Sequence, residues 1–512
     1  MLTKGPQNYV TDNFTEDNEP GNTFFETAAR IAQGIDSLEA RSEILSLTAI
    51  KYAEVDRLDL AVDLAVTIGD SYLRDQSLAI IAGKSVELGA GDYADTIANI
   101  IEDDSAYAVA IEQMAVAYAE AGAFDKALEV AQQLAESAPA LNRIALSYAV
   151  QGRPAEALQT AGSIDYPDLK ANVLVELAGK ALHEERNDDA AELLLEARTA
   201  IEEVEFPEQQ VSILIALASL NHKSGQKAAA VEMLTQARDL ANESQDLARD
   251  GQLVQIAGGW AELQRYDEAD QVIEEVEHPF QFAHATARIA LEHHKAGATA
   301  KALELLTDAT EVVREEEVYG DQSLRMRESL LAELASCYAF AGHYDEALQI
   351  AGGMSTAEEQ HRTLAEIAKR CVRSGHNDRV IQVTEMIKDA YARVLVELEI
   401  VDAFVASEQL ELADHALSRT QTYIATMERP YEKAMALMEL APRLARREQV
   451  KEQAGQASRV LFEALTTLSE IDGAYHQSHA LINLAGKYQK LGQHPGENEQ
   501  QVLEEMLHRQ ER

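Results

Sequence analysis

Few residues in this sequence have the types and spacing that catalysis or metal binding requires. The tripeptide Gly83–Ser85 matches the end of a phosphate-binding loop, in which backbone N–H groups and a lysine hold phosphate oxygens. Leu78 stands where that loop needs its first glycine, and the segment has the pattern of a helix interior. His476 and His479 could share a helix face and bind a metal ion, but no third ligand is apparent. We therefore expect no catalytic, cofactor-binding or metal-binding residues.

The cysteines favour packing over chemistry. Cys337 and Cys371 are the only two in the chain, so no disulfide framework is expected and a reducing cytoplasm is the default compartment. The sequence contains no H-E-x-x-H, no G-x-G-x-x-G, no paired C-x-x-C and no nucleophile elbow. These absences predict a protein that is not an enzyme.

One short segment reverses the charge of the chain. The whole sequence carries a net charge of −44, but basic residues outnumber acidic ones between His361 and Arg379. Our hypothesis is that this segment receives an acidic stretch of a partner, and the alternative is that it neutralises acidic neighbours in the same molecule. The four cations proposed to bind the partner are Arg362, Lys369, Arg370 and Arg373. A smaller basic group follows at Arg443, Arg446, Arg447 and Lys451.

A repeat of small side chains indicates which elements position these residues. Alanine recurs at one place throughout the chain, at intervals of 30 to 45 residues, and only Val401 breaks the series. A period in this range is typical of stacked helical hairpins. The alanines are Ala49, Ala82, Ala115, Ala145, Ala178, Ala218, Ala257, Ala290, Ala335, Ala368, Ala441 and Ala485.

The residues around each alanine explain the hairpin. In one copy, Ala115 is followed by Tyr118, then Gly122, then Ala127. Apolar residues at helical spacing flank the glycine, which readily adopts the left-handed backbone that ends a helix. Two helices joined by so short a turn pack antiparallel, and alanine on both facing stripes lets their axes come close. Because a single hairpin leaves apolar faces uncovered, each copy needs the next one.

This arrangement resembles the tetratricopeptide repeat (TPR). The family's order of small residue, aromatic, glycine, aromatic and alanine is matched by Ala115, Tyr118, Gly122, Phe124 and Ala127. The resemblance implies an all-α fold, an α-solenoid of about 13 TPR-like antiparallel helical hairpins in a right-handed superhelix. The chain departs from the family in lacking most of the prolines that end the second helix, and several second helices are stretched.

Composition predicts the boundaries of the repeat region. Residues 1–22 are polar and contain two prolines, which predicts a disordered N-terminal tail. Residues 23–36 begin with capping-box spacing and predict an N-terminal capping helix, similar to the second half of a repeat whose first half is absent. The solenoid is expected over residues 37–497. The polar residues 498–512 predict a C-terminal capping helix that keeps the end of the stack soluble.

Charge and hydropathy exclude several classes of partner. A net charge of −44 argues against nucleic-acid binding, which needs a basic surface. No run of 18 apolar residues occurs, so no membrane span is expected, and the start lacks the apolar core of a signal peptide. The acidity is explained either by a salt-rich cytoplasm or by an ordinary acidic protein that its charge keeps soluble.

Two functions fit these expectations. The favoured one is a non-enzymatic scaffold or adaptor that binds proteins through the concave face of the solenoid and needs no cofactor. The first helices around Val109–Val116 and Leu146–Val150 are rich in Ala, Val and Leu, which suits an apolar or amphipathic helical peptide. The alternative is a regulatory or sensor arm that binds a peptide or small effector and acts through a separate output protein. The sequence leaves the oligomeric state open.

Overall fold

The computed structural model describes residues 22–164, 166–243, 248–451 and 455–510. Within these ranges the chain forms 27 α-helices and no strand, which confirms the all-α prediction. The predicted disordered tail, residues 1–22, lies outside the described residues except for Asn22, the first residue of a helix.

The helices belong to two compact units, which are described separately. Unit 1 comprises residues 1–135 and 387–512, and unit 2 comprises residues 136–386. The helices of unit 1 are α2 (Asn22–Ala32), α3 (Leu38–Glu54), α4 (Leu58–Ala65), α5 (Ser71–Glu87), α6 (Gly91–Ala98), α7 (Asp104–Glu120), α8 (Phe124–Ala131), α23 (Ala390–Ala406), α24 (Leu410–Ala425), α25 (Pro430–Lys451), α26 (Gln456–Leu468), α27 (Ala474–Lys490) and α28 (Glu497–Gln510). The helices of unit 2 are α9 (Ala138–Val150), α10 (Pro154–Gly162), α11 (Pro167–His183), α12 (Asn187–Ile201), α13 (Pro207–Lys223), α14 (Lys227–Glu243), α15 (Arg249–Glu262), α16 (Tyr266–Ile273), α17 (Pro279–Lys295), α18 (Thr299–Glu315), α19 (Gly320–Phe340), α20 (Tyr344–Gly352), α21 (Ala357–Arg373) and α22 (Asn377–Glu385).

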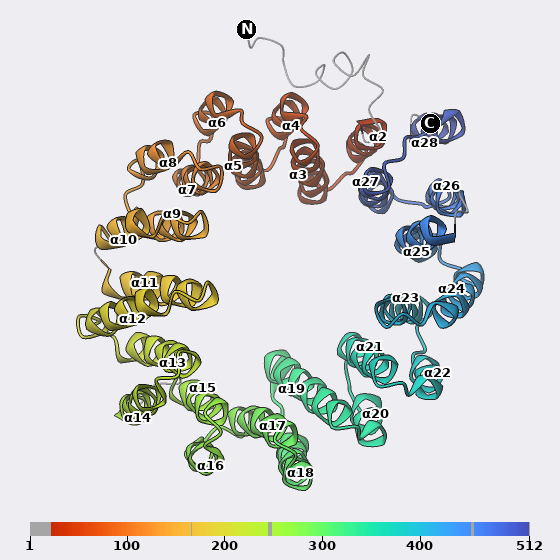
Figure 1. The fold of residues 1–512 in the computed structure, drawn as a ribbon. Helices are drawn as coiled ribbons and strands as arrows, with labels where there is room; N and C mark the ends of the chain where they lie inside the picture. The colour runs from red at the N-terminus through yellow and green to blue at the C-terminus, as the bar shows by residue number, and fades with distance from the viewer. Residues whose placement is uncertain (1–21, 165, 244–247, 452–454, 511–512) are drawn as a thin grey trace. The chain divides into compact units, whose positions relative to one another are not determined.

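Successive helices pair as hairpins (Figure 1). The pairs run from α3 with α4 to α25 with α26, while α27 packs against α2, which precedes it by most of the sequence. The described part of the chain is therefore an all-α solenoid of 12 TPR-like hairpins of consecutive helices and a thirteenth pair formed by α27 and α2, where the alanine series predicts about 13 copies. The predicted handedness of the superhelix concerns the arrangement of the whole chain and stays a prediction.

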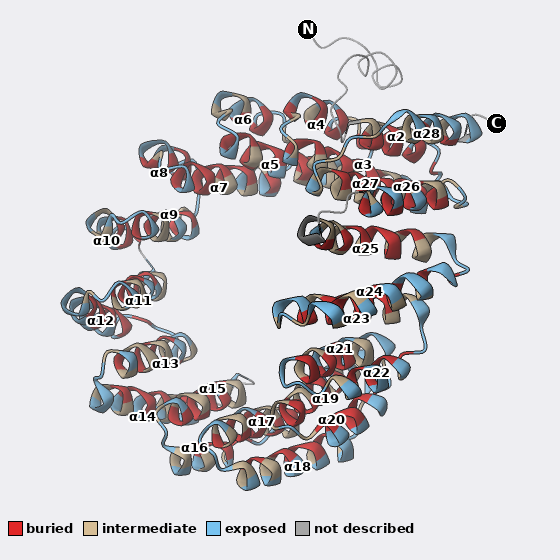
Figure 2. Cartoon of the chain, turned by 45° about the vertical axis from the view of Figure 1, so that its right-hand side comes forward, coloured by how far each residue is buried: buried red, intermediate tan, exposed pale blue. Residues whose placement is uncertain are grey.

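The small residues of the repeat lie at the hairpin contacts. Ala115 on α7 and Ala127 on α8 are both fully buried, and every alanine of the series is at most 1% exposed. Figure 2 shows buried positions in red along the sides where helices meet their neighbours. A methyl group lets the helix axes come close, and only α23 accommodates a larger side chain there, the buried Val401. The alanine period is thus a packing requirement.

The turns between paired helices close as the sequence predicts. Gly122 adopts a φ of 79° between α7 and α8, and the next N–H, that of Ala123, donates to the carbonyl of Tyr118 at 2.8 Å. This bond satisfies a carbonyl that the helix leaves open at its C-terminal end. In copies without glycine, a polar residue takes the same left-handed backbone at some conformational cost. These residues are Asp56, Glu185, Gln264 and Glu408.

A buried acceptor near the start of several first helices ties one hairpin to the next. The carboxylate of Asp75, on α5, accepts hydrogen bonds from the N–H groups of Glu102 at 3.1 Å and Asp103 at 2.9 Å, just before α7. Glu328, on α19, accepts in the same way from the two N–H groups that precede α21. Each acceptor stands seven residues before the repeat alanine, so its side chain reaches the next interhelical loop. The acceptors of this kind are Ser42, Asp75, Asp250 and Glu328.

Candidate partner-binding surface

The cations proposed to bind a partner lie on α21, the first helix of its hairpin in unit 2. Arg362 is exposed and pairs with Glu359 of its own helix at 2.5 Å. Lys369 is half-buried and pairs with Glu366, also on α21. Arg373 is exposed at the C-terminal end of the helix. Spacings of seven and four residues place these three cations on one side of α21.

Arg370 has a different role from the other three cations. Its guanidinium carbon lies 4.0 Å from the centre of the Phe340 ring, at the end of α19. Phe340 in turn contacts His294 of α17, with 5.6 Å between ring centroids and the rings nearly perpendicular. Side chains from three successive first helices therefore form one continuous line, and Phe340 in its middle is half-exposed. The sequence pattern did not mark Phe340, because it lies two residues after Tyr338, outside the aromatic position of the repeat.

The alternative explanation for this basic segment is neutralisation within the molecule, and one of its cations supports it. Arg379 of α22 binds both carboxylate oxygens of Asp345 on α20, the shorter distance being 2.5 Å. The printed acid partner of Arg362, however, comes from the same helix at three-residue spacing, and the Arg362 side chain is 63% exposed. Exposed ion pairs of this kind contribute little free energy, about 0.3–0.5 kcal/mol each. Arg362 and Arg373, which are both exposed, are thus accessible to an incoming carboxylate.

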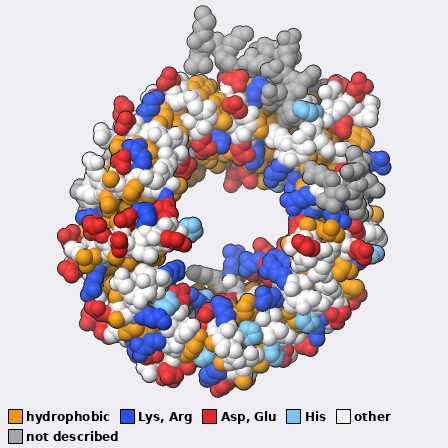
Figure 3. Space-filling model, viewed as in Figure 1, with side chains coloured by type: hydrophobic (Ala, Val, Ile, Leu, Met, Phe, Trp, Pro, Cys, Tyr) orange, Lys and Arg blue, Asp and Glu red, His pale blue; other side chains and the backbone are white. Residues whose placement is uncertain are grey.

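The second basic group is neutralised by acids of neighbouring helices. Arg443 of α25 binds Asp402 of α23 at 2.8 Å, and Arg446 approaches the same carboxylate at 3.6 Å. Glu439, one turn before Arg443 on α25, accepts hydrogen bonds from Arg443 at 3.3 Å and from Lys487 of α27 at 2.6 Å. Basic and acidic side chains are interspersed over the visible surface in the same manner (Figure 3). The side chain of Lys451 lies outside the described residues.

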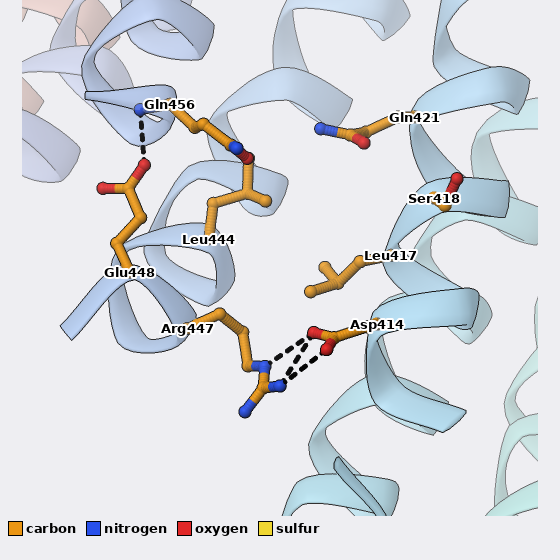
Figure 4. Close-up of a pocket in the computed structure, with 8 residues that line it drawn as sticks. All are labelled: Asp414, Leu417, Ser418, Gln421, Leu444, Arg447, Glu448 and Gln456. Atoms are coloured by element: carbon orange, nitrogen blue, oxygen red, sulfur yellow. Dashed lines mark hydrogen bonds and ion pairs between the residues drawn. The ribbon is translucent and has the colours of Figure 1, made fainter. Parts of the chain in front are cut away.

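Arg447 belongs to a small cavity of about 130 Å³ between α24, α25 and α26. Its guanidinium forms two hydrogen bonds with Asp414, at 2.9 and 2.8 Å, and faces that carboxylate directly (Figure 4). Arg447 is only 7% exposed, so this pair lies in a largely dry environment. At the opposite wall, Glu448 accepts hydrogen bonds from the N–H groups of Gln456 and Ala457 and so caps α26. The charged groups around the cavity therefore serve to hold the three helices together.

Apolar side chains on other first helices differ in accessibility. Val116 of α7 is 7% exposed, because α5 and α7 pack closely, so the groove expected around Val109–Val116 is largely filled. Val150, the last residue of α9, is 75% exposed, and Leu146 one turn earlier is half-buried. The end of α9 thus exposes more apolar surface than Val116 does on α7.

The two histidines considered as metal ligands instead make contacts with protein side chains. His479 lies on α27, where its Nδ1 is 3.1 Å from the hydroxyl of Tyr431 and 3.3 Å from the amide nitrogen of Asn483. Burial lowers the pKa of His479, although the nearby Glu43 opposes this shift. His476 packs against Tyr431 and Tyr475. Within the described ranges, no group of three or more His, Cys, Asp or Glu side chains is arranged to hold a metal ion.

A search of solved structures finds helical-repeat proteins. The pentatricopeptide repeat protein PPR10 from maize is 11% identical over 96% of this chain and 87% of its own, with a TM-score of 0.31. A Rap protein complexed with Competence and Sporulation Factor is 13% identical over 69% of this chain and 98% of its own, with a TM-score of 0.27. The human IFIT1 dimer with PPP-AAAA is 14% identical over 81% of this chain and 94% of its own, with a TM-score of 0.24.

At these scores the three structures carry no argument about what this chain binds. No family model and no curated protein matches the sequence. Among the helices described, none is both long and apolar enough to cross a bilayer.

Proposed function

We propose that this protein is a non-enzymatic scaffold that binds a segment of another protein along the first helices of its hairpins. The observation that carries the proposal is the surface formed by α17, α19 and α21, where Arg370 stacks on the half-exposed ring of Phe340. The other three cations, Arg362, Lys369 and Arg373, lie along one side of α21. A segment that combines carboxylates with apolar side chains fits this surface. Its carboxylates would replace Glu359 and Glu366 beside Arg362 and Lys369, and an apolar side chain would cover Phe340.

The overall charge supports a protein partner over a nucleic acid. A net charge of −44 repels a polyphosphate at long range, whereas a short acidic segment needs only a local cluster of cations. The hairpins on either side of the surface hold it rigid, so little conformational entropy is lost when a partner binds. These properties suit an adaptor that presents one preformed face to a peptide.

A defined probe tests the proposal. Fluorescence anisotropy would measure binding of a labelled amphipathic helical peptide with Glu on its polar face and Leu on its apolar face. The triple variant Arg362→Glu, Lys369→Glu and Arg373→Glu should bind this peptide about 5- to 10-fold more weakly, since three exposed charge contacts contribute about 1–1.5 kcal/mol together. Salt should weaken binding to the original protein as well.

The matched control reverses three cations on second helices of the same unit: Arg198, Lys227 and Lys301. The control has the same net charge as the triple variant, so it should change binding less than about 2-fold once long-range charge is accounted for. A peptide in which Lys replaces every Glu is attracted by the acidic surface as a whole, so the triple variant should bind it no more weakly than the control does. Equal binding of the Glu peptide to the triple variant and to the control would refute the site.

A further inference from the structure

Helix α2 is buried as deeply as any helix inside the solenoid. The side chains of Phe24, Phe25, Ala28, Ile31 and Ala32 are each at most 1% exposed. An isolated helix of 11 residues is marginal in water, so α2 owes its structure to the surfaces around it. Three other helices provide those surfaces.

The partners of α2 come from both parts of unit 1. Phe24 packs against Tyr488 of α27, with ring centroids 4.9 Å apart, and Phe25 packs edge-on against Tyr52 of α3 at 5.3 Å. Helix α28 covers another side and buries Leu503 to 1% exposure. In Figure 1, α2 lies between α27, α3 and α28.

This arrangement makes α2 the second helix of the last hairpin. Helix α27 has the features of a first helix, including the fully buried Ala485, but α28 packs against α2 and α26 in place of pairing with α27. The first helices continue across the same junction, where the hydroxyl of Tyr475 on α27 donates to Glu43 on α3 at 3.1 Å. One hairpin is thus assembled from two segments that are distant in the sequence.

We propose that α2 exchanges between copies of this chain, so that α2 of one copy pairs with α27 of a second copy. The groove on α27, α3 and α28 fits α2 side chain by side chain, and the α2 of another copy is chemically identical. Only the five residues 33–37 connect α2 to α3, and Gln33 and Gly34 among them are exposed. A short exposed connection of this kind can act as the hinge of a swapped element.

The exchanged dimer restores every contact that is lost when α2 leaves its groove. If α2 leaves α27, the rings of Phe24 and Phe25 and the ring of Tyr488 become exposed to water together. Burial of these aromatic side chains removes a large apolar area from water, so an opened copy is strongly driven to close again. It closes on itself when dilute and on a second opened copy when concentrated. Two copies that exchange α2 reciprocally form a closed dimer with the same interfaces as the monomer.

Complementation between two variants tests the exchange. Phe24→Asp disables α2 but leaves α27 intact, whereas Tyr488→Asp disables the groove on α27 but leaves α2 intact. Neither variant can form the α2–α27 pair on its own. In a mixture, the intact α2 of the Tyr488→Asp variant can pair with the intact α27 of the Phe24→Asp variant. Sedimentation velocity should show each variant as a monomer and the equimolar mixture as a heterodimer.

A control pair carries the same changes in net charge at exposed positions next to the contact, Gln33→Asp and Lys490→Gln. Both control variants should remain monomeric, alone and mixed. Circular dichroism should show native helicity for all four variants, because the other hairpins hold each other. A mixture of the two folded contact variants that stays monomeric would rule out the exchange.

A measurement on the unaltered protein covers the case in which a variant fails to fold. Donor-labelled and acceptor-labelled copies would be mixed at high concentration and then diluted. Energy transfer should appear on mixing and decay slowly after dilution, since each dimer must open two buried α2 contacts before it separates. No transfer on mixing, at any concentration up to the solubility limit, would equally overturn the proposal. Neither test involves a foreign peptide, so its result is independent of the scaffold function.

Discussion

At the scale of single residues, a few buried polar side chains form hydrogen bonds between hairpins, which the apolar side chains of the repeat cannot do. Asp75 is 2% exposed, yet its carboxylate accepts hydrogen bonds from Arg74 at 2.8 Å and from two backbone N–H groups. Burial alone would raise the pKa of Asp75, but the Arg74 hydrogen bond and the backbone donors outweigh burial and hold that pKa below its usual value. The charged form is therefore the one that joins α5 to the loop before α7.

Replacing Asp75 with Ala should destabilise the protein by about 2–5 kcal/mol, because two buried N–H groups lose their acceptor. Urea unfolding followed by circular dichroism measures the change. Asp104→Ala, at an exposed position of α7, is the control and should cost less than about 1 kcal/mol. If Asp75→Ala lowers the free energy of unfolding no more than Asp104→Ala does, water readily replaces the carboxylate.

The same carboxylate predicts a dependence on pH. Because the folded-state pKa of Asp75 lies below the unfolded value near 3.8, its contribution is complete above about pH 4–5 and is lost as pH falls through the folded-state pKa. The stability difference between the original protein and Asp75→Asn should therefore shrink as unfolding is measured from pH 7 down to pH 3. A difference that is constant over this range would mean that the charge of Asp75 is not what stabilises the fold.

At the scale of helices, the sequence predicted the pattern that each element follows. The alanine positions located the first helices, Gly122 located a hairpin turn, and Cys371 takes the aromatic position of its copy as a fully buried packing residue. Apolar periodicity reveals which side of a helix is buried, because it reflects only the loss of contact with water. It carries no information on which segment covers that side. For this reason the partner of α2 could not be predicted, although its own helical stripe could.

The candidate site shows the same limit. The four cations on α21 were predicted from charge alone, but the separate role of Arg370 depends on the ring of Phe340 on another helix. Spacing along one helix predicts which side chains share a face and not what stands opposite. The assignment of these cations to a partner stays a prediction.

Two glycines at the same place in the repeat give a matched test of helix spacing. A Cβ added at Gly83 of α5 would lie 2.9 Å from the Cβ of Gln113 on α7, whereas one added at Gly486 of α27 would have no heavy atom within 4 Å. Gly83→Ala should lower stability by about 1–3 kcal/mol through overpacking, and Gly486→Ala should raise it by up to about 1 kcal/mol through helix propensity. Thermal or urea unfolding compares them, and changes of the same sign in both variants would contradict the close approach of α5 and α7.

At the scale of the whole molecule, electrostatic repulsion opposes folding. The chain holds 88 acidic and 44 basic residues, so the folded state concentrates a large excess of negative charge. The many ion pairs at three- and four-residue spacing recover only part of this cost. The excess charge affects the stability of every hairpin, whatever its local contacts.

Salt should therefore stabilise this protein. Raising NaCl from about 0.05 M to about 1 M shortens the screening length to about 3 Å and should raise the midpoint of thermal unfolding by several degrees. Calorimetry at constant pH measures the shift. A midpoint that does not change, or one that falls, would indicate that the ion pairs already balance the repulsion and would weigh against a salt-rich cytoplasm as the origin of the acidity.

The pairing of α2 with α27 also has a consequence for biosynthesis. A ribosome adds about 5–20 residues per second, so roughly 20–90 s pass between the emergence of Ala32 and that of Ala474. During that time the nascent polypeptide carries Phe24 and Phe25 without the groove that will later enclose them. Until α27 has been synthesised, a chaperone or transient non-native contacts must keep these aromatic side chains from aggregating.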